Sequence, residues 1–189
     1  PYQGQLPHIA ICGCIGPRGD AYALNRSITA EDAEAYHAAQ LRVLRDCEVD
    51  LAMAATFNNV PEAVGVSRAA AAAGVPLTVS FTLDGRSRLR SGPTLRQAIE
   101  DTDAQAGPAA PAFYGINCSH PIEFEPALEA GDWIGRVRSL RPNAAKMDKV
   151  SLCSLGHIEE GDPVELGEMM ADLSRRYPHM DVWGGCCGT

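Results

Sequence analysis

The sequence contains no long apolar run and no excess of basic residues. A membrane-spanning helix needs about 20 consecutive apolar residues, and no segment of this 189-residue chain approaches that length, so we expect no membrane partner. The 24 Asp and Glu residues outnumber the 16 Lys and Arg residues, which gives a formal net charge of −8. Because an acidic surface repels phosphate backbones, we also expect no nucleic-acid partner.

The sequence also lacks the features of a secreted, disulfide-bonded domain. Its first residues do not combine a basic start with an apolar core, as a signal peptide does, and its seven cysteines are an odd number. We therefore expect a cytoplasmic protein whose cysteines serve metal binding or catalysis rather than a disulfide scaffold. The seven are Cys12, Cys14, Cys47, Cys118, Cys153, Cys186 and Cys187.

The pattern along the chain predicts an α/β fold. Short apolar segments alternate with helical patterns, which is typical of a parallel sheet with helical crossovers. Such a sheet can be doubly wound or form part of an eight-stranded barrel, and in both cases functional side chains are expected where strands end at their carboxyl edge. The predicted strands are 8–16, 49–57, 75–83, 112–118, 137–143 and 180–189.

Capping signals between these segments predict the helices. The clearest helix start is at Asp162, which is followed by a proline at the first helical position and an acid at the third. Cys47 is predicted on the buried face of the first helix. The apolar face predicted after Asp162 comprises Leu166, Met169, Met170, Leu173 and Tyr177. The other predicted helices span 29–47, 61–74, 94–102, 122–130 and 132–140.

Three cysteines fall at the ends of predicted strands. Cys118 ends one strand, and Cys186 and Cys187 end another between glycines that allow the backbone to bend. Three clustered thiolates repel one another unless a cation neutralises them, and Zn²⁺ suits such ligands while keeping a fourth position open. The residues alone leave three interpretations: a metal site, buried apolar cysteines or a redox pair.

Two of these segments carry a family resemblance. "GGCCGT" at 184–189, with "GINC" at 115–118 upstream, resembles the homocysteine S-methyltransferase family, which includes betaine- and S-methylmethionine-dependent enzymes. Further segments match the family in the same order along essentially the whole chain. These are "CIGPRGD" at 14–20, "VDLAMAATF" at 49–57, "VPLTVSF" at 75–81 and "RPNAA" at 141–145.

The resemblance implies a fold, a metal and a reaction. The fold is a (β/α)₈ TIM barrel, expected over 1–189 as an incomplete portion with about six of eight strands, without the first two strands and the last helix. The implied cofactor is Zn²⁺ on Cys118, Cys186 and Cys187, with no catalytic residue beyond the metal site. The implied reaction transfers a methyl group from an activated donor to the thiolate of homocysteine and gives methionine, so the partners are small molecules.

Substrate contacts are expected from Thr56, Asn117 and Asn143. The family usually has an acid before the threonine of the second segment, where it contacts the substrate amino acid, but this chain has Ala55. This departure keeps two alternatives open: a zinc enzyme of the same fold that acts on a different thiol or selenol, and a non-catalytic zinc- or thiol-binding barrel. The sequence specifies neither the methyl donor nor the oligomeric state.

Other residues near the site are expected to have structural roles. Cys12 and Cys14 lie two residues apart and therefore on one face of a strand, where packing in the core or barrel interior is preferred to a second metal site. His120 follows Cys118 by two residues, and we expect it to support the loop or the site.

Overall fold

Six parallel strands form one curved sheet. The computed structural model describes residues 4–189, except the side chains of Lys149 and Val150. The strands follow one another in sequence order from β1 to β6, and each neighbouring pair is parallel. They are β1 (Cys12–Ile15), β2 (Leu51–Phe57), β3 (Leu77–Phe81), β4 (Phe113–Asn117), β5 (Val137–Arg141) and β6 (Val182–Trp183).

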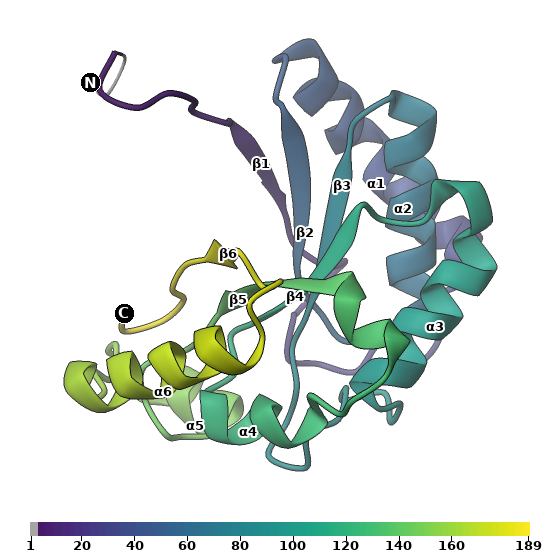
Figure 1. Cartoon of the computed structure of the whole chain (residues 1–189). Coiled ribbons are helices and arrows are strands. Elements are labelled where there is room, and N and C mark those ends of the chain that lie inside the picture. Colours follow the sequence, from purple (N-terminus) through teal and green to yellow (C-terminus); the bar gives the residue numbers. More distant parts are fainter. Residues whose placement is uncertain (1–3) are drawn as a thin grey trace.

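The sheet is an open half-barrel, as Figure 1 shows. β1 and β6 lie at its two edges, and α1, α2 and α3 lie along its outer side. This arrangement confirms the predicted α/β fold. The helices are α1 (Ala30–Asp46), α2 (Val60–Ala73), α3 (Leu95–Ala106), α4 (Pro121–Phe124), α5 (Lys149–Ser154) and α6 (Pro163–Arg176), with 3₁₀ turns η1 (Gly107–Ala109), η2 (Glu125–Ala127) and η3 (Asp132–Arg136).

The predicted caps begin the main helices. The Thr29 hydroxyl accepts a hydrogen bond from the Asp32 N–H at 3.1 Å and begins α1. Asp162 accepts from the N–H groups of Val164 and Glu165 and begins α6. These side chains satisfy backbone donors that have no partner within the helix, which is why such residues favour helix starts.

Alternation along β2 separates the core from the interior of the half-barrel. Ala52 and Ala54 are completely buried in the core, and Phe57 is buried as well because the register shifts between Ala54 and Phe57. Met53 and Ala55 are half-buried and line a pocket on the inner side. Two successive residues of a strand point to opposite faces, so the strand presents one face to the core and the other to the site.

The segment between β4 and β5 differs from the prediction. Instead of helices over 122–130 and 132–140, it holds one turn of α4, two 3₁₀ turns and then β5 from Val137. Pro126 cannot donate the hydrogen bond that would continue α4, and Gly131 with φ 154° interrupts the chain again. The strand also predicted over 137–143 is present as β5, and its pairing with β4 overrides the helical pattern predicted over 132–140.

Two further expectations were wrong in detail. The last strand is only two residues long because the glycine-rich segment after Trp183 turns. Cys47 is exposed rather than buried, since it caps the end of α1 beyond its last turn. On α6, Leu173 is buried, and Met170 and Tyr177 pack against the core as predicted. None of the described helices has both the length and the apolar character to cross a membrane.

Candidate metal centre and adjoining pockets

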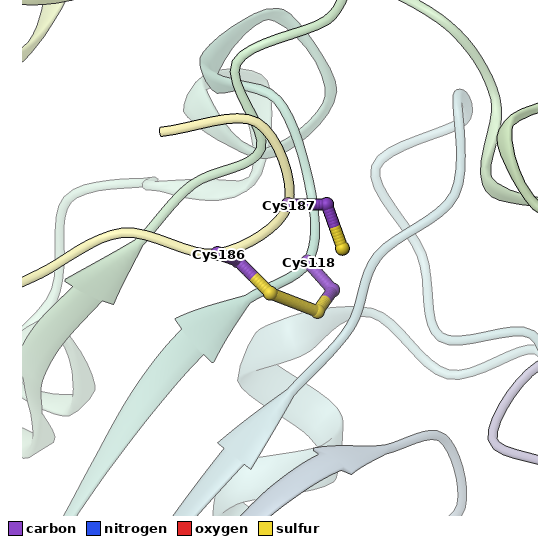
Figure 2. Close-up of side chains that lie close together, drawn as sticks. All are labelled: Cys118, Cys186 and Cys187. Atoms are coloured by element: carbon purple, nitrogen blue, oxygen red, sulfur yellow. A yellow bond between two sulfur atoms is a disulfide. The ribbon is translucent and has the colours of Figure 1, made fainter. Parts of the chain in front are cut away.

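Three sulfur atoms come together at the carboxyl edge of the sheet. The Sγ atoms of Cys118, Cys186 and Cys187 all lie within 4.8 Å of one another (Figure 2). Cys118 directly follows β4, and the other two follow β6. The two strands flank β5, and parallel strands end at the same edge, so residues 68 positions apart meet there. The structure therefore brings together the three cysteines that the sequence singled out.

The backbone around the cysteines is tightly constrained. Cys118 has a left-handed φ of 52°, and the Cys186 N–H donates to the Pro142 carbonyl oxygen at 2.8 Å. Gly188 has φ 77°, and a Cβ there would lie 2.5 Å from the carbonyl oxygen of Glu159. Only glycine fits this turn without strain. The turn carries two successive cysteines toward Cys118, which a regular strand could not do.

Two of the three cysteines are oxidised. Cys118 and Cys186 form a disulfide, and Cys187 is free (Figure 2). The bond joins the end of β4 to the segment after β6 and not the two adjacent cysteines. A sulfur in a disulfide offers no thiolate to a metal. The same three atoms therefore serve either as one disulfide and one thiol or, when reduced, as three thiolate donors.

The chemistry of the reduced donor set fits a zinc ion. Three thiolates are soft ligands, and three protein ligands leave one coordination position for a substrate. Cys118 is buried, Cys186 is half-buried and Cys187 is exposed, so the cluster opens toward solvent on the Cys187 side. It is the only group of at least three potential ligands that the described part of the chain brings into such proximity.

Thr56 and Asn117 lie beside Cys118 and contact each other. The Asn117 side-chain oxygen accepts from the Thr56 N–H at 2.8 Å, and its NH₂ group donates to the Thr56 hydroxyl at 2.8 Å. The same NH₂ group donates to Cys118 Sγ at 3.3 Å, and the Thr56 hydroxyl lies 3.8 Å from that sulfur. Donors aimed at sulfur favour its thiolate form. Sequence reasoning missed this contact with Cys118, although the adjacency of Asn117 and Cys118 was a signal for it.

These two residues line the first of two pockets whose walls include the clustered cysteines. This pocket, here called the inner pocket, has a volume of about 470 Å³ and lies on the inner side of the half-barrel. Cys12 and Cys14 are exposed toward it and form no metal cluster among the described residues. Its walls are Cys12, Cys14, Met53, Ala55, Thr56, Asn117, Cys118, Arg141, Gly185 and Cys186.

Asn143 lines the second pocket, here called the Tyr22 pocket. This pocket has a volume of about 360 Å³, and Cys187 forms part of its wall. Asn143 is buried, and its side-chain oxygen has no hydrogen-bond partner, so it is available to a bound molecule. Burial, with the nearby Cys187, raises the pKa of Tyr22 to about 12, so its hydroxyl stays protonated at neutral pH. The walls are Tyr22, Asn143, Leu152, Cys153, Gly156, His157, Ile158, Glu159 and Cys187.

His120 has a structural role next to this site. Its Nδ1 accepts from the Ile122 N–H at 3.3 Å at the start of α4. The side chain is buried, and this burial lowers the pKa of the imidazole, with Lys146 acting in the same direction. A neutral ring that caps a helix matches the supporting role expected for this residue.

Solved structures resemble the fold. Three are of the homocysteine methyltransferase MmuM from Escherichia coli: an apo form (21% identity, TM-score 0.63), a metallated form (21%, 0.66) and an oxidized form (23%, 0.67). The matches cover 96%, 97% and 100% of this chain but 59%, 58% and 61% of MmuM. At these identities the likeness shows the fold alone.

Comparison of the sequence identifies the family. The search of curated proteins gave no match. A model of the family described as homocysteine S-methyltransferase matches residues 2–189. This match covers nearly every residue, including the segments that end in Cys118 and in Cys186 and Cys187. The chain therefore belongs to the homocysteine S-methyltransferase family.

Proposed function

We propose that this chain carries the metal centre of a zinc-dependent S-methyltransferase. The enzyme transfers a methyl group from an activated donor to the thiolate of homocysteine and releases methionine. The observation that carries this proposal is the meeting of three cysteine sulfur atoms within 4.8 Å at the carboxyl edge of the half-barrel. Family membership agrees with it. Because the chain spans about 60% of the length of the solved relatives, the activity belongs to the whole protein.

Cys118, Cys186 and Cys187 would hold the zinc ion. When bound, zinc lowers the pKa of a thiol at its open position and so keeps that sulfur nucleophilic near neutral pH. Asn117 and Thr56 orient the Cys118 sulfur through the contacts described above. The protein otherwise acts by holding two substrates in line, which can supply a large part of a rate enhancement.

The two pockets suit two substrates. Cys118 and Cys186 line the inner pocket, and Cys187 lines the Tyr22 pocket. We assign the acceptor thiol to the inner pocket, beside Thr56 and Asn117, and the methyl donor to the Tyr22 pocket. There the free side-chain oxygen of Asn143 can contact the donor. The sulfur and the methyl group would meet at the three cysteines, whose sulfur atoms lie within 4.8 Å of one another.

The test is metal content and methyl transfer in the reduced, full-length protein. We expect about one zinc ion per chain, as three thiolates and one substrate complete a tetrahedral site. Cys118→Ser, Cys186→Ser and Cys187→Ser should each lose zinc and transfer to homocysteine. The control is Cys47→Ser, an exposed cysteine outside the site, which should keep both. Absence of zinc from folded, reduced protein, or its retention in all three site variants, would refute the metal centre.

The same assay separates the alternatives. Transfer to a different thiol or selenol but not to homocysteine would favour the second enzyme class, which the presence of Ala55 supports. Zinc and homocysteine binding without transfer from S-methylmethionine, S-adenosylmethionine or betaine would favour a non-catalytic barrel.

A further inference from the structure

The inner pocket contains a single cationic side chain and no carboxylate. Its ten wall residues include one arginine, Arg141, and no Asp, Glu, Lys or His. Arg141 is the last residue of β5, next to the segment that carries Cys186. Burial and the neighbouring Cys14 raise the pKa of Cys12, so this thiol stays neutral at physiological pH and does not offset the guanidinium. Cys118 and Cys186 also belong to these walls and would carry negative charge as zinc-bound thiolates, so Arg141 is the one positively charged side chain of the walls rather than part of a positive surface.

Arg141 has few partners of its own. Its Nε donates to the Gly185 carbonyl oxygen at 3.4 Å, and one terminal nitrogen lies 3.6 Å from the Met53 sulfur. No carboxylate among the described residues pairs with it. Arg138, three positions earlier on β5, instead forms an ion pair with Asp181. A guanidinium has five N–H donors, so Arg141 keeps most of them available for a ligand.

No carboxylate lines the inner pocket to bind a positively charged group. Ala55 on β2 contributes only a methyl group to the wall. An ammonium group placed beside Arg141 would be near a guanidinium of the same sign and would find no carboxylate among the wall residues, which disfavours its charged form. A carboxylate, by contrast, matches the fork of an arginine and can form two parallel hydrogen bonds with it.

We propose that Arg141 binds the carboxylate of the acceptor, and that the acceptors of this protein are anionic thiols of the mercaptocarboxylate class. The amino group of homocysteine then contributes little to recognition. This inference rests on the proposed function, because it assigns the acceptor to the inner pocket. In this proposal, the residue that recognises the carboxylate is the last residue of β5.

The experiment compares three thiols of the same chain length on the reduced, zinc-loaded, full-length protein. L-Homocysteine carries both groups, 4-mercaptobutanoate lacks the amino group, and 3-mercaptopropylamine lacks the carboxylate. We expect kcat/KM for 4-mercaptobutanoate to stay within about threefold of that for homocysteine. The value for 3-mercaptopropylamine should fall about 100-fold, because a charge-assisted bidentate contact is lost.

Variants of Arg141 provide the second readout. Arg141→Met keeps the volume without the charge, and it should weaken binding of both carboxylate thiols about 100-fold in calorimetry and in KM. Binding of 3-mercaptopropylamine should not weaken. Arg141→Lys should recover part of the loss, since it restores the charge but not the fork. Arg138→Met, on the same strand but outside the pocket walls, is the matched control and should bind all three thiols normally.

The outcomes separate this inference from the proposed function. If homocysteine is methylated but 4-mercaptobutanoate binds 100-fold more weakly, the amino group is recognised and the inference is wrong while the function stands. Unchanged binding in a folded, zinc-loaded Arg141→Met protein also overturns it. If no thiol is methylated, the proposed function fails, and calorimetry with 4-mercaptobutanoate still decides whether Arg141 holds the carboxylate.

Discussion

At the residue scale, the contacts around one sulfur atom matter most. Cys118 accepts from the Asn117 side chain at 3.3 Å, and Asn117 in turn exchanges two hydrogen bonds with Thr56. Both backbone positions on either side of this contact are unusual, since Thr56 has φ 64° and Cys118 has φ 52°. Non-glycine residues rarely adopt this region, and such strain concentrates at functional sites. The contact therefore holds a candidate ligand in one orientation.

We predict that Asn117→Ala weakens zinc binding by about tenfold to 100-fold, the usual effect of removing a group that orients a metal ligand. The measurement is competition for zinc against a chelator in reduced protein. Thr56→Val, which removes the hydroxyl at the same shape, should weaken binding less, and Thr56→Ser should bind as the original does. Equal affinities in all four proteins would contradict the orienting role.

At the element scale, α1 and α2 approach each other closely over Gly65. A Cβ on Gly65 would lie 2.4 Å from the Ala30 carbonyl oxygen and 2.5 Å from the Ala33 Cβ. Ala33 is completely buried, as are several α2 residues around Gly65. The glycine therefore sets the distance between the two helices, and with it the position of α2, which begins at Val60 shortly after β2.

We predict that Gly65→Ala lowers the free energy of unfolding by about 1–3 kcal/mol, because overpacking at this contact exceeds the gain in helix propensity. Gly167 offers a matched control, since it lies in α6 with no atom near its added Cβ. Gly167→Ala should raise the free energy of unfolding by about 0.5–1 kcal/mol. Urea unfolding of both variants measures the difference, and destabilisation of equal size in both would contradict the packing argument.

The elements also show what the sequence could reveal. The caps at Thr29 and Asp162 and the placement of Cys118 could be predicted because each depends on a few neighbouring residues or on a strand end. The strand β5 was predicted, but the short turns between β4 and β5 were not, because prolines, glycines and tertiary pairing decide them. The contact of Asn117 with Thr56 crosses 61 positions, and the walls of the inner pocket come from four strands, β1, β2, β4 and β5, so neither is visible in a local pattern.

At the scale of the whole molecule, the described half-barrel has two open edges. β1 and β6 each pair on one side only. Exposed apolar side chains accompany these edges, including Ile11 with 61% and Val182 with 40% of its surface accessible. Such edges present unpaired backbone groups that can pair with another chain, and closing an eight-stranded barrel needs more strands than these six.

We therefore predict that residues 1–189 expressed alone self-associate. Size-exclusion chromatography with light scattering should show species larger than one chain at micromolar concentrations. Ile11→Lys combined with Val182→Lys should reduce association, since edge charges oppose pairing. Ile158→Lys, at an exposed apolar residue outside the sheet, serves as the control. A monomeric chain with its original edges would refute this prediction.

Because β6 is short, the cysteines also help to hold the end of the sheet together. This strand is two residues long and meets β5 at only two register positions. Beyond it, backbone hydrogen bonds from Gly184 to Leu140 and from Cys186 to Pro142 continue the contact with the end of β5. The Cys118–Cys186 disulfide, or a metal ion bound in its place, connects the segment after β6 to the end of β4 on the other side of β5. Such a cross-link lowers the conformational entropy of the chain between the two cysteines. In the reduced, metal-free chain neither cross-link is present, so we expect loss of the ion to weaken the attachment of β6 to the sheet.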